Sequence, residues 1–211
     1  MDKLSFHALT PERWSDLESL FGERGACGGC WCMFWRVPRK AFEASKGAGN
    51  KRAFRNLVKM GKEPGILAYS RSEPVGWCAI APREEYVALE RSRLLQPIDE
   101  KPVWSVSCFF IKRPYRRRGL SVKLLQAAVG FAAKRGAKIV EGYPAEPSND
   151  KVADPFLWHG VAAAFKKAGF KEVVRRAPTR PIMRYQVEAK SKGRARSRGQ
   201  GRREDYLTFD V

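Results

Sequence analysis

The turn within residues 109–121 constrains this chain more than any other segment. Residues 103–111 are rich in β-branched and aromatic side chains, which favours a strand. Residues 118–134 carry apolar side chains at helical spacing, and Gly136 follows them as a helix stop. The short basic turn between them must therefore bring the start of a helix to the end of a strand, as α/β folds do.

This turn has the chemistry of an anion site. The first turn of a helix leaves about four N–H groups without acceptors, and the helix dipole makes that end positive. Gly119 has no Cβ to keep an anion away from the main chain, and Arg116, Arg117 and Arg118 add positive charge. The segment predicts a bound phosphate or pyrophosphate. The alternative is an ordinary solvated basic turn before a helix.

The remaining elements complete an α/β pattern. We expect helices over residues 11–21, over 39–60 with a break near 47–50, over 89–95 and over 161–168, and strands over 65–70, 75–81, 137–143, 171–176 and 182–187. The strands over 65–70 and 75–81 are close enough to form a hairpin. These elements predict one domain over residues 1–188.

The C-terminal segment, residues 189–211, differs from the rest. Residues 190–203 contain seven lysines or arginines, no acidic residue and no large apolar side chain, which predicts a disordered tail. The whole chain has a net charge of +19, so an anionic partner is expected. Nucleic acid could bind this tail through its charge, but the tail has no interleaved aromatic residues for base stacking.

Several classes of protein are disfavoured by the sequence. No apolar run approaches the roughly 20 residues of a membrane span, and residues 1–10 lack the apolar core of a secretory signal. We therefore expect a cytoplasmic protein without membrane contact. The five cysteines are an odd count and are expected to be reduced thiols. Cys27, Cys30 and Cys32 have spacing compatible with zinc, but a structural zinc needs four ligands, so we expect no metal.

The run Arg116-x-x-Gly119-x-Ser121 resembles the Gln/Arg-x-x-Gly-x-Gly/Ala pattern of the GNAT superfamily of acetyl-CoA-dependent N-acetyltransferases. The order of the flanking elements also matches that family, including a short helix that ends in Gly169-Phe170. The resemblance implies a mixed, mostly antiparallel sheet that is splayed at two central parallel strands and flanked by helices.

The resemblance also implies where acetyl-CoA would bind as co-substrate. Main-chain groups near Phe109 and Ile111 would pair with the pantetheine arm, and Asn149 would contact it. The pyrophosphate would lie at the turn, whose expected binding residues are Arg116, Arg117, Arg118, Gly119, Leu120 and Ser121. Phe165 stands where many members of the family have a tyrosine that protonates the leaving thiolate.

Acylation of an amine requires removal of a proton from its nitrogen. Glu141, on the second splayed strand, is the expected general base, and Tyr143 on the same strand face is the expected acid. The alternative is that both are ordinary strand residues. A surface or capping role is favoured for His159. The resemblance further implies that the loop after the first helix lines the acceptor pocket, with Trp31, Met33 and Trp35.

Together these features predict an N-acyltransferase that passes an acetyl or related acyl group directly to a primary amine on a small molecule or a protein. Two alternatives stay open. One is a nucleic-acid-associated protein recruited by its charge. The other is a CoA-binding regulator without catalysis, suggested by Phe165. A homodimer is compatible with the sequence.

Overall fold

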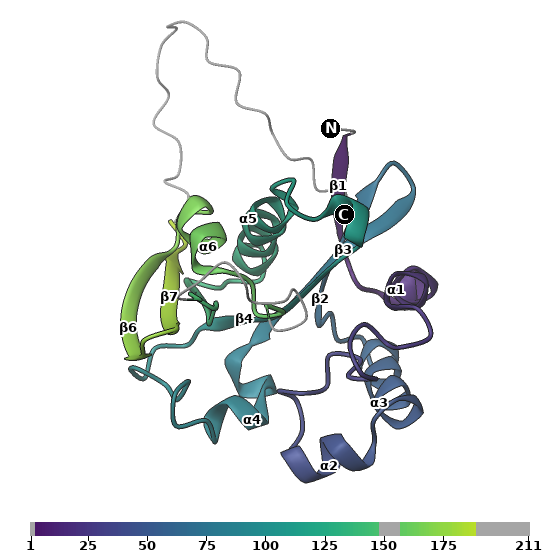
Figure 1. The fold of residues 1–211 in the computed structure, drawn as a ribbon, viewed down its shortest axis with the longest axis horizontal. Helices are drawn as coiled ribbons and strands as arrows, with labels where there is room; N and C mark the ends of the chain where they lie inside the picture. The colour runs from purple at the N-terminus through teal and green to yellow at the C-terminus, as the bar shows by residue number, and fades with distance from the viewer. Residues whose placement is uncertain (1–2, 148–156, 189–211) are drawn as a thin grey trace, which may run out of the picture.

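The computed structural model describes residues 3–147 and 157–188, and it contains one seven-stranded sheet (Figure 1). The strand order is β1-β2-β3-β4-β5-β7-β6. The strands are β1 (Leu4–Ala8), β2 (Gly65–Ser70), β3 (Glu73–Pro82), β4 (Trp104–Ile111), β5 (Ile139–Gly142), β6 (Lys171–Ala177) and β7 (Arg180–Gln186). All neighbouring strands are antiparallel except β4 and β5, which run parallel.

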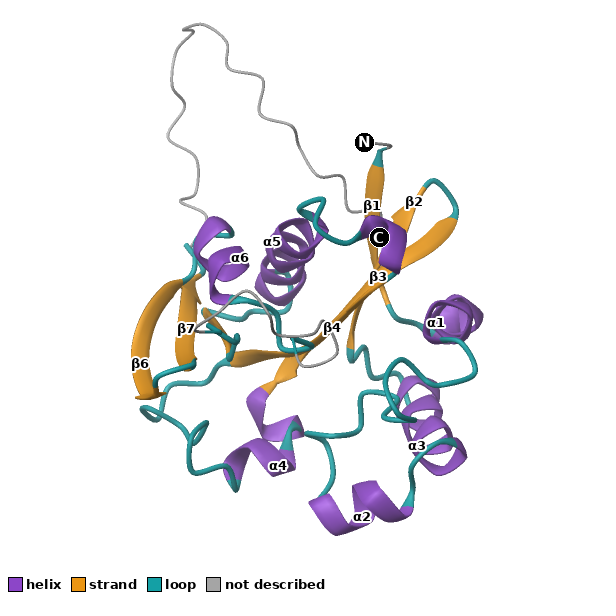
Figure 2. Cartoon of the chain, viewed as in Figure 1, coloured by secondary structure: helices purple, strands orange, loops and turns teal. Residues whose placement is uncertain are grey.

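Helices cover both faces of this sheet (Figure 2). The helices are η1 (Pro11–Arg13), α1 (Trp14–Phe21), α2 (Arg39–Ala44), α3 (Ala48–Lys59), η2 (Arg83–Glu85), α4 (Val87–Glu90), η3 (Arg113–Tyr115), α5 (Leu120–Ala133) and α6 (Ala162–Lys167). Helices α5 and α6 pack on one face, and α1, α2 and α3 pack on the other. Within the described residues, no helix combines the length and the apolar character of a membrane span.

Strand β2 explains how two separate cores form around one sheet. All six of its residues are buried, although their side chains alternate between the faces. Ile66 and Ala68 pack in the core under α5, whereas Leu67 and Tyr69 pack in the core under α1 and α3. A strand that is covered on both faces is expected to be mainly apolar, and β2 is apolar apart from the buried Ser70 and the Tyr69 hydroxyl, which donates to Asp16.

The parallel pair β4 and β5 separates after three paired positions. Trp104 pairs with Val140, Ser105 with Glu141, and Val106 with Gly142, and β4 then continues to Ile111 without β5 beside it. The predicted fold class, a mostly antiparallel sheet splayed at two central parallel strands, is therefore confirmed.

The observed elements differ from the expected ones in two places. Strand β1 was not expected, and the helix expected over residues 89–95 ends at Glu90. Arg83 explains the early end, because its guanidinium donates hydrogen bonds to the carbonyls of Leu89 and Leu95 and turns this segment inward. Asn149 and residues 189–211 lie outside the described part of the chain, so the expected pantetheine contact and the tail stay predictions.

Candidate acyl-CoA and acceptor site

The turn between β4 and α5 places main-chain donors at the end of the splayed strand. Gly119 precedes α5 with φ +78° and ψ 4°, and Arg117 also has a positive φ of 58°. The left-handed conformation at Gly119 directs the chain into the helix, whose first N–H groups have no acceptor inside it. No side chain of the described residues caps this helix end. The turn therefore ends in an uncapped helix start, and the anion site expected there stays a prediction.

Side chains hold this turn in position from two sides. Lys112 and Tyr115 both donate to the carboxylate of Glu73, at 2.8 and 3.0 Å, and Glu73 begins β3. The hydrogen bond from Lys112 is the main reason that the pKa of Glu73 lies below its ordinary value. Arg116 donates through Nε to the carbonyl of Ile111 at 2.9 Å. These contacts fix the turn before any ligand arrives.

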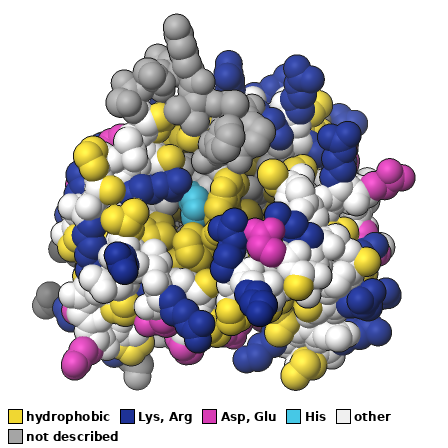
Figure 3. Space-filling model, turned by 60° about the horizontal axis from the view of Figure 1, so that its bottom comes forward, with side chains coloured by type: hydrophobic (Ala, Val, Ile, Leu, Met, Phe, Trp, Pro, Cys, Tyr) yellow, Lys and Arg dark blue, Asp and Glu magenta, His cyan; other side chains and the backbone are white. Residues whose placement is uncertain are grey.

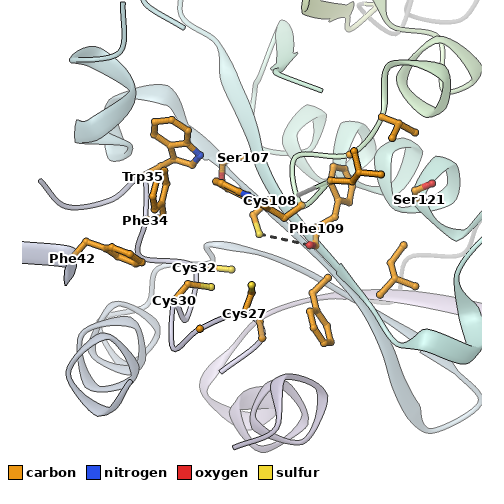
Figure 4. Close-up of a pocket in the computed structure, with 18 of the residues that line it drawn as sticks. Cys27, Cys30, Cys32, Phe34, Trp35, Phe42, Ser107, Cys108, Phe109 and Ser121 are labelled. Carbon is orange, nitrogen blue, oxygen red and sulfur yellow. Dashed lines mark hydrogen bonds between the residues drawn. The ribbon is translucent and has the colours of Figure 1, made fainter. Parts of the chain in front are cut away.

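A pocket of about 560 Å³ extends from this turn along the exposed side of β4 (Figures 3 and 4). Its walls come from the loop before α2, from α2, from β4, from the start of α5 and from residues 157–161. On the molecular surface, hydrophobic side chains gather around this hollow, with lysines and arginines around them (Figure 3). Phe34, Trp35 and Phe42 lie at one end of the pocket and Ser121 at the other, with the cysteines between them (Figure 4).

The expected cofactor residues divide into two groups. Phe109, Ile111, Arg116, Arg117 and Ser121 line the pocket. Arg118 and Gly119 are exposed but are not part of this lining, and the side chain of Leu120 is buried in the core under α5. Leu120 can therefore contribute only its main-chain N–H to an anion.

The main chain of residues 157–161 enters the gap between β4 and β5. The N–H of Phe109 donates to the carbonyl of Trp158 at 2.7 Å, and Ala145 forms a parallel bridge with Val161. The expected pairing of pantetheine with main-chain groups near Phe109 and Ile111 stays a prediction, and pantetheine could use the Phe109 N–H only by displacing the Trp158 carbonyl. Since main-chain groups alternate along a strand, the N–H of Ile111 points to the same side.

The residues expected to form the acceptor pocket also fall into two groups. Trp35 lines the pocket, but Trp31 and Met33 are only 3% and 4% exposed and pack in the core under α1 and α3. Trp31 is held between Trp14 and Phe21. The acceptor roles of Trp31 and Met33 are thus corrected to core packing. Phe34, Phe42 and Trp158 line the pocket instead. Of these three residues, only Phe34 had a signal in the sequence, which was the aromatic richness of its loop.

Four of the five cysteines, Cys27, Cys30, Cys32 and Cys108, line the same pocket (Figure 4). Burial raises the pKa of Cys30 to about 11, and contact with Cys32 followed by burial raises the pKa of Cys108. Both groups therefore stay uncharged thiols near neutral pH. Among the described residues, no group of three or more His, Cys, Asp or Glu side chains is arranged to hold a metal ion.

Glu141 and Tyr143 lie in a buried polar cluster outside the lining of the pocket. Glu141 is 1% exposed, and it accepts hydrogen bonds from Tyr143 at 2.7 Å, from Arg184 at 2.7 Å and from Arg83 at 3.3 Å. The hydroxyl of Tyr143 also contacts Ser105 and Arg83. A carboxylate enclosed by two guanidinium groups cannot reach an amine, so the predicted roles of base and acid are corrected to structural ones.

Phe165 and His159 lie behind the pocket. Phe165 is fully buried against Phe109, and a Cβ at Gly142 would meet its ring at 2.1 Å. The ring of His159 stacks on Trp158 at 3.6 Å between centroids and is 5% exposed, so it has neither the surface nor the capping role that was favoured for it.

Burial of His159 predicts a loss of stability in acid. Desolvation, with a smaller effect of Arg180, lowers the pKa of this imidazole to about 3 in the folded protein, below about 6.5 in the unfolded chain. Its contribution is complete above pH 6.5 and is lost as the pH falls toward 3. The free energy of unfolding should fall by about 2 kcal/mol from this group between pH 7.5 and pH 5. Denaturant titrations of wild type and His159→Phe test this, because the variant should lose that part of the pH slope. An identical slope in both proteins would contradict it.

The fold and the site define an α/β protein with a basic turn and an uncapped helix start beside a splayed parallel strand pair. A sequence model described as the acetyltransferase (GNAT) family matches residues 31–154, which is more than half of the chain. The chain therefore belongs to the GNAT family, whose members use acetyl-CoA. A comparison with curated protein sequences found no match.

Solved structures support the same fold at low sequence identity. A GNAT-family acetyltransferase from Listeria monocytogenes has a TM-score of 0.54 and 10% identity, over 88% of this chain and 96% of its own. One from Streptococcus agalactiae has a TM-score of 0.53 and 12% identity, over 88% and 96%. The PaiA N-acetyltransferase from Thermoplasma acidophilum, in complex with coenzyme A, has a TM-score of 0.50 and 14% identity, over 88% and 99%.

Proposed function

We propose that this protein transfers an acyl group from acetyl-CoA directly to the nitrogen of an amine. The observation that carries the proposal is that one pocket runs along the edge of β4 where β5 separates from it. This pocket joins the uncapped start of α5 to the aromatic side chains of Phe34, Trp35 and Phe42. A donor bound at one end and an acceptor bound at the other would meet beside β4. That geometry favours direct transfer, because orientation alone lowers the barrier of a two-substrate reaction.

The residues at the turn fit the diphosphate of CoA. The left-handed Gly119 leaves open space where a Cβ would stand, so an anion can approach the main chain closely. Arg116 and Arg117 line the same part of the pocket and supply positive charge, and Ser121 adds a hydroxyl. Acetyl-CoA would supply the activated thioester.

The strand edge would orient the reacting groups. Ile111 points its N–H toward the gap and can pair with an amide of the pantetheine arm, while Phe109 and Trp158 close the pocket behind it. The apolar wall excludes water, which strengthens polar contacts to the thioester. No described carboxylate in the lining is positioned as a base. The acceptor amine would therefore have to be neutral already when it enters the pocket.

The test is a thiol-release assay with acetyl-CoA and a broad panel of amines. We expect release of CoA that depends on the amine and yields an N-acylated product, identified by mass spectrometry. Reactions without amine give the background hydrolysis. If CoA binds by calorimetry but no amine promotes its release, the protein is a CoA-binding regulator and the proposal is wrong.

A further inference from the structure

We infer that the acceptor is a weakly basic amine carried on an aromatic ring, and that Phe34, Trp35, Phe42 and Trp158 form the surface that receives the ring. The inference rests on the proposed function and names the acceptor class for the same pocket. Three features of the described residues carry it: the absence of an available carboxylate, the cations already lying on two rings, and the arrangement of the four rings.

The described lining of the pocket offers no unpaired carboxylate that would hold an ammonium group. Glu43 is the one carboxylate in the described lining. It accepts a hydrogen bond from Arg39 Nε at 2.7 Å and pairs with Lys46 Nζ at 2.5 Å. The bond to Lys46 is the main reason that the pKa of Glu43 is lowered, so this carboxylate is a poor base. An ammonium would lose hydration in the pocket without gaining a partner.

The aromatic rings do not compensate for that loss. A ring face can bind a cation, and cages of such faces bind quaternary ammonium groups. Here the guanidinium of Arg39 lies 5.6 Å from the centre of Phe34, and the Nζ of Lys46 lies 5.6 Å from the centre of Phe42. Two of the four rings thus already carry a cation, which repels another one.

The same rings suit a neutral aromatic guest. Phe34 makes edge contacts with Trp35, Phe42 and Trp158, with centroids 4.9, 5.2 and 5.3 Å away. A connected set of edge-to-face contacts can extend to one more ring. The thiols of Cys30 and Cys108 complete an uncharged, polarisable wall.

Basicity distinguishes the amines that fit. An alkylamine such as a lysine side chain has a pKa near 10.4, so it is almost entirely an ammonium ion at pH 7. An aromatic amine, whose nitrogen lone pair is delocalised into the ring, is neutral at that pH. It can enter this pocket and attack the thioester carbonyl as the neutral amine, and as the C–S bond breaks its N–H proton passes to the leaving thiolate to give the CoA thiol, so the described lining need not supply a general base.

A matched pair of probes tests the inference. Calorimetry on the CoA complex of the full-length protein would compare an aniline with the benzylamine of the same ring substitution, with spermidine as a polycation. At pH 7 we expect the aniline to bind at least about tenfold more tightly than the benzylamine, and spermidine not to bind. Raising the pH toward 9 should narrow the difference, because more benzylamine becomes neutral. Tighter binding of benzylamine or spermidine would overturn the inference.

Variants locate the binding surface. Trp35→Ala should weaken aniline binding by about tenfold and leave CoA affinity unchanged, whereas Trp35→Phe should restore most of the binding. The double variant Arg39→Gln with Lys46→Gln frees Glu43 and two ring faces, and should shrink the preference for aniline several-fold. An unchanged aniline affinity in Trp35→Ala would overturn the assignment of this surface.

The readouts separate this inference from the proposed function. If aniline binds as expected but no amine releases thiol, the acceptor surface stands and the acyltransferase proposal fails. If a lysine peptide or spermidine is acylated in preference to aniline, the acyltransferase proposal stands and the inference fails.

Discussion

Gly119→Val is expected to weaken CoA binding by at least about tenfold, measured by calorimetry. The backbone at position 119 is left-handed, with φ +78°, which costs a β-branched residue about 1–2 kcal/mol. The chain can relieve this strain only by turning the first N–H groups of α5 away from their present direction. The valine side chain would also stand in the open space that a phosphate needs. Both effects would weaken binding of the CoA diphosphate that is proposed to lie at this turn.

Gly136→Val is the matched control for this prediction. Gly136 follows the other end of the same helix, has φ +83° and also has open space where a Cβ would stand. The two variants should lose similar amounts of stability in thermal unfolding, but only Gly119→Val should lose CoA affinity. Equal CoA affinity in both variants would contradict the assignment of the turn.

Glu141→Gln is expected to destabilise the fold by about 3–5 kcal/mol, because the substitution removes the one fully buried carboxylate charge between the guanidinium groups of Arg83 and Arg184 and leaves each with a single, more exposed partner, Glu90 or Asp99. Arg83 and Arg184 both bond to this carboxylate, and both side chains are more than nine-tenths buried. Denaturant unfolding measures the loss. At a temperature where the variant is folded, turnover per folded molecule should stay within a few-fold of wild type.

Glu90→Gln provides the comparison for Glu141. Glu90 also pairs with Arg83, at 2.7 Å, but its side chain is 46% exposed, so its loss should cost less than about 1 kcal/mol. If Glu141→Gln instead keeps wild-type stability and loses turnover a hundredfold or more, Glu141 is a base after all.

The parts of the fold that depend on local pattern could be predicted from the sequence. The apolar strand, the basic turn and the amphipathic helix of residues 103–134 are contiguous, and their predicted order is confirmed by β4, η3 and α5. Strand β1 escaped prediction because it is short and only Phe6 is fully buried in it. Its extended form depends on pairing with β2, some 60 residues away.

The walls of the pocket depend on contacts that no local pattern encodes. Trp31 and Cys32 have positive φ angles of 42° and 54°, so alternation along the chain does not predict which side chains of this loop face the pocket. Trp35 faces it, and Trp31 does not. Strand alternation correctly placed the side chain of Tyr143 beside that of Glu141, to which it donates a hydrogen bond. The two arginines that enclose the carboxylate come from positions 58 and 43 residues away.

The hydrogen bond from the Phe109 N–H to the carbonyl of Trp158 affects which parts of acetyl-CoA would contribute most to its binding affinity. A pantetheine carbonyl that takes this N–H replaces a peptide carbonyl of the same strength, so the exchange adds little binding free energy. Affinity is then concentrated at the charged end of the molecule and should decline with ionic strength. A pantetheine thioester that lacks the nucleotide would be a poor competitor for this protein, even though it carries the same reactive bond.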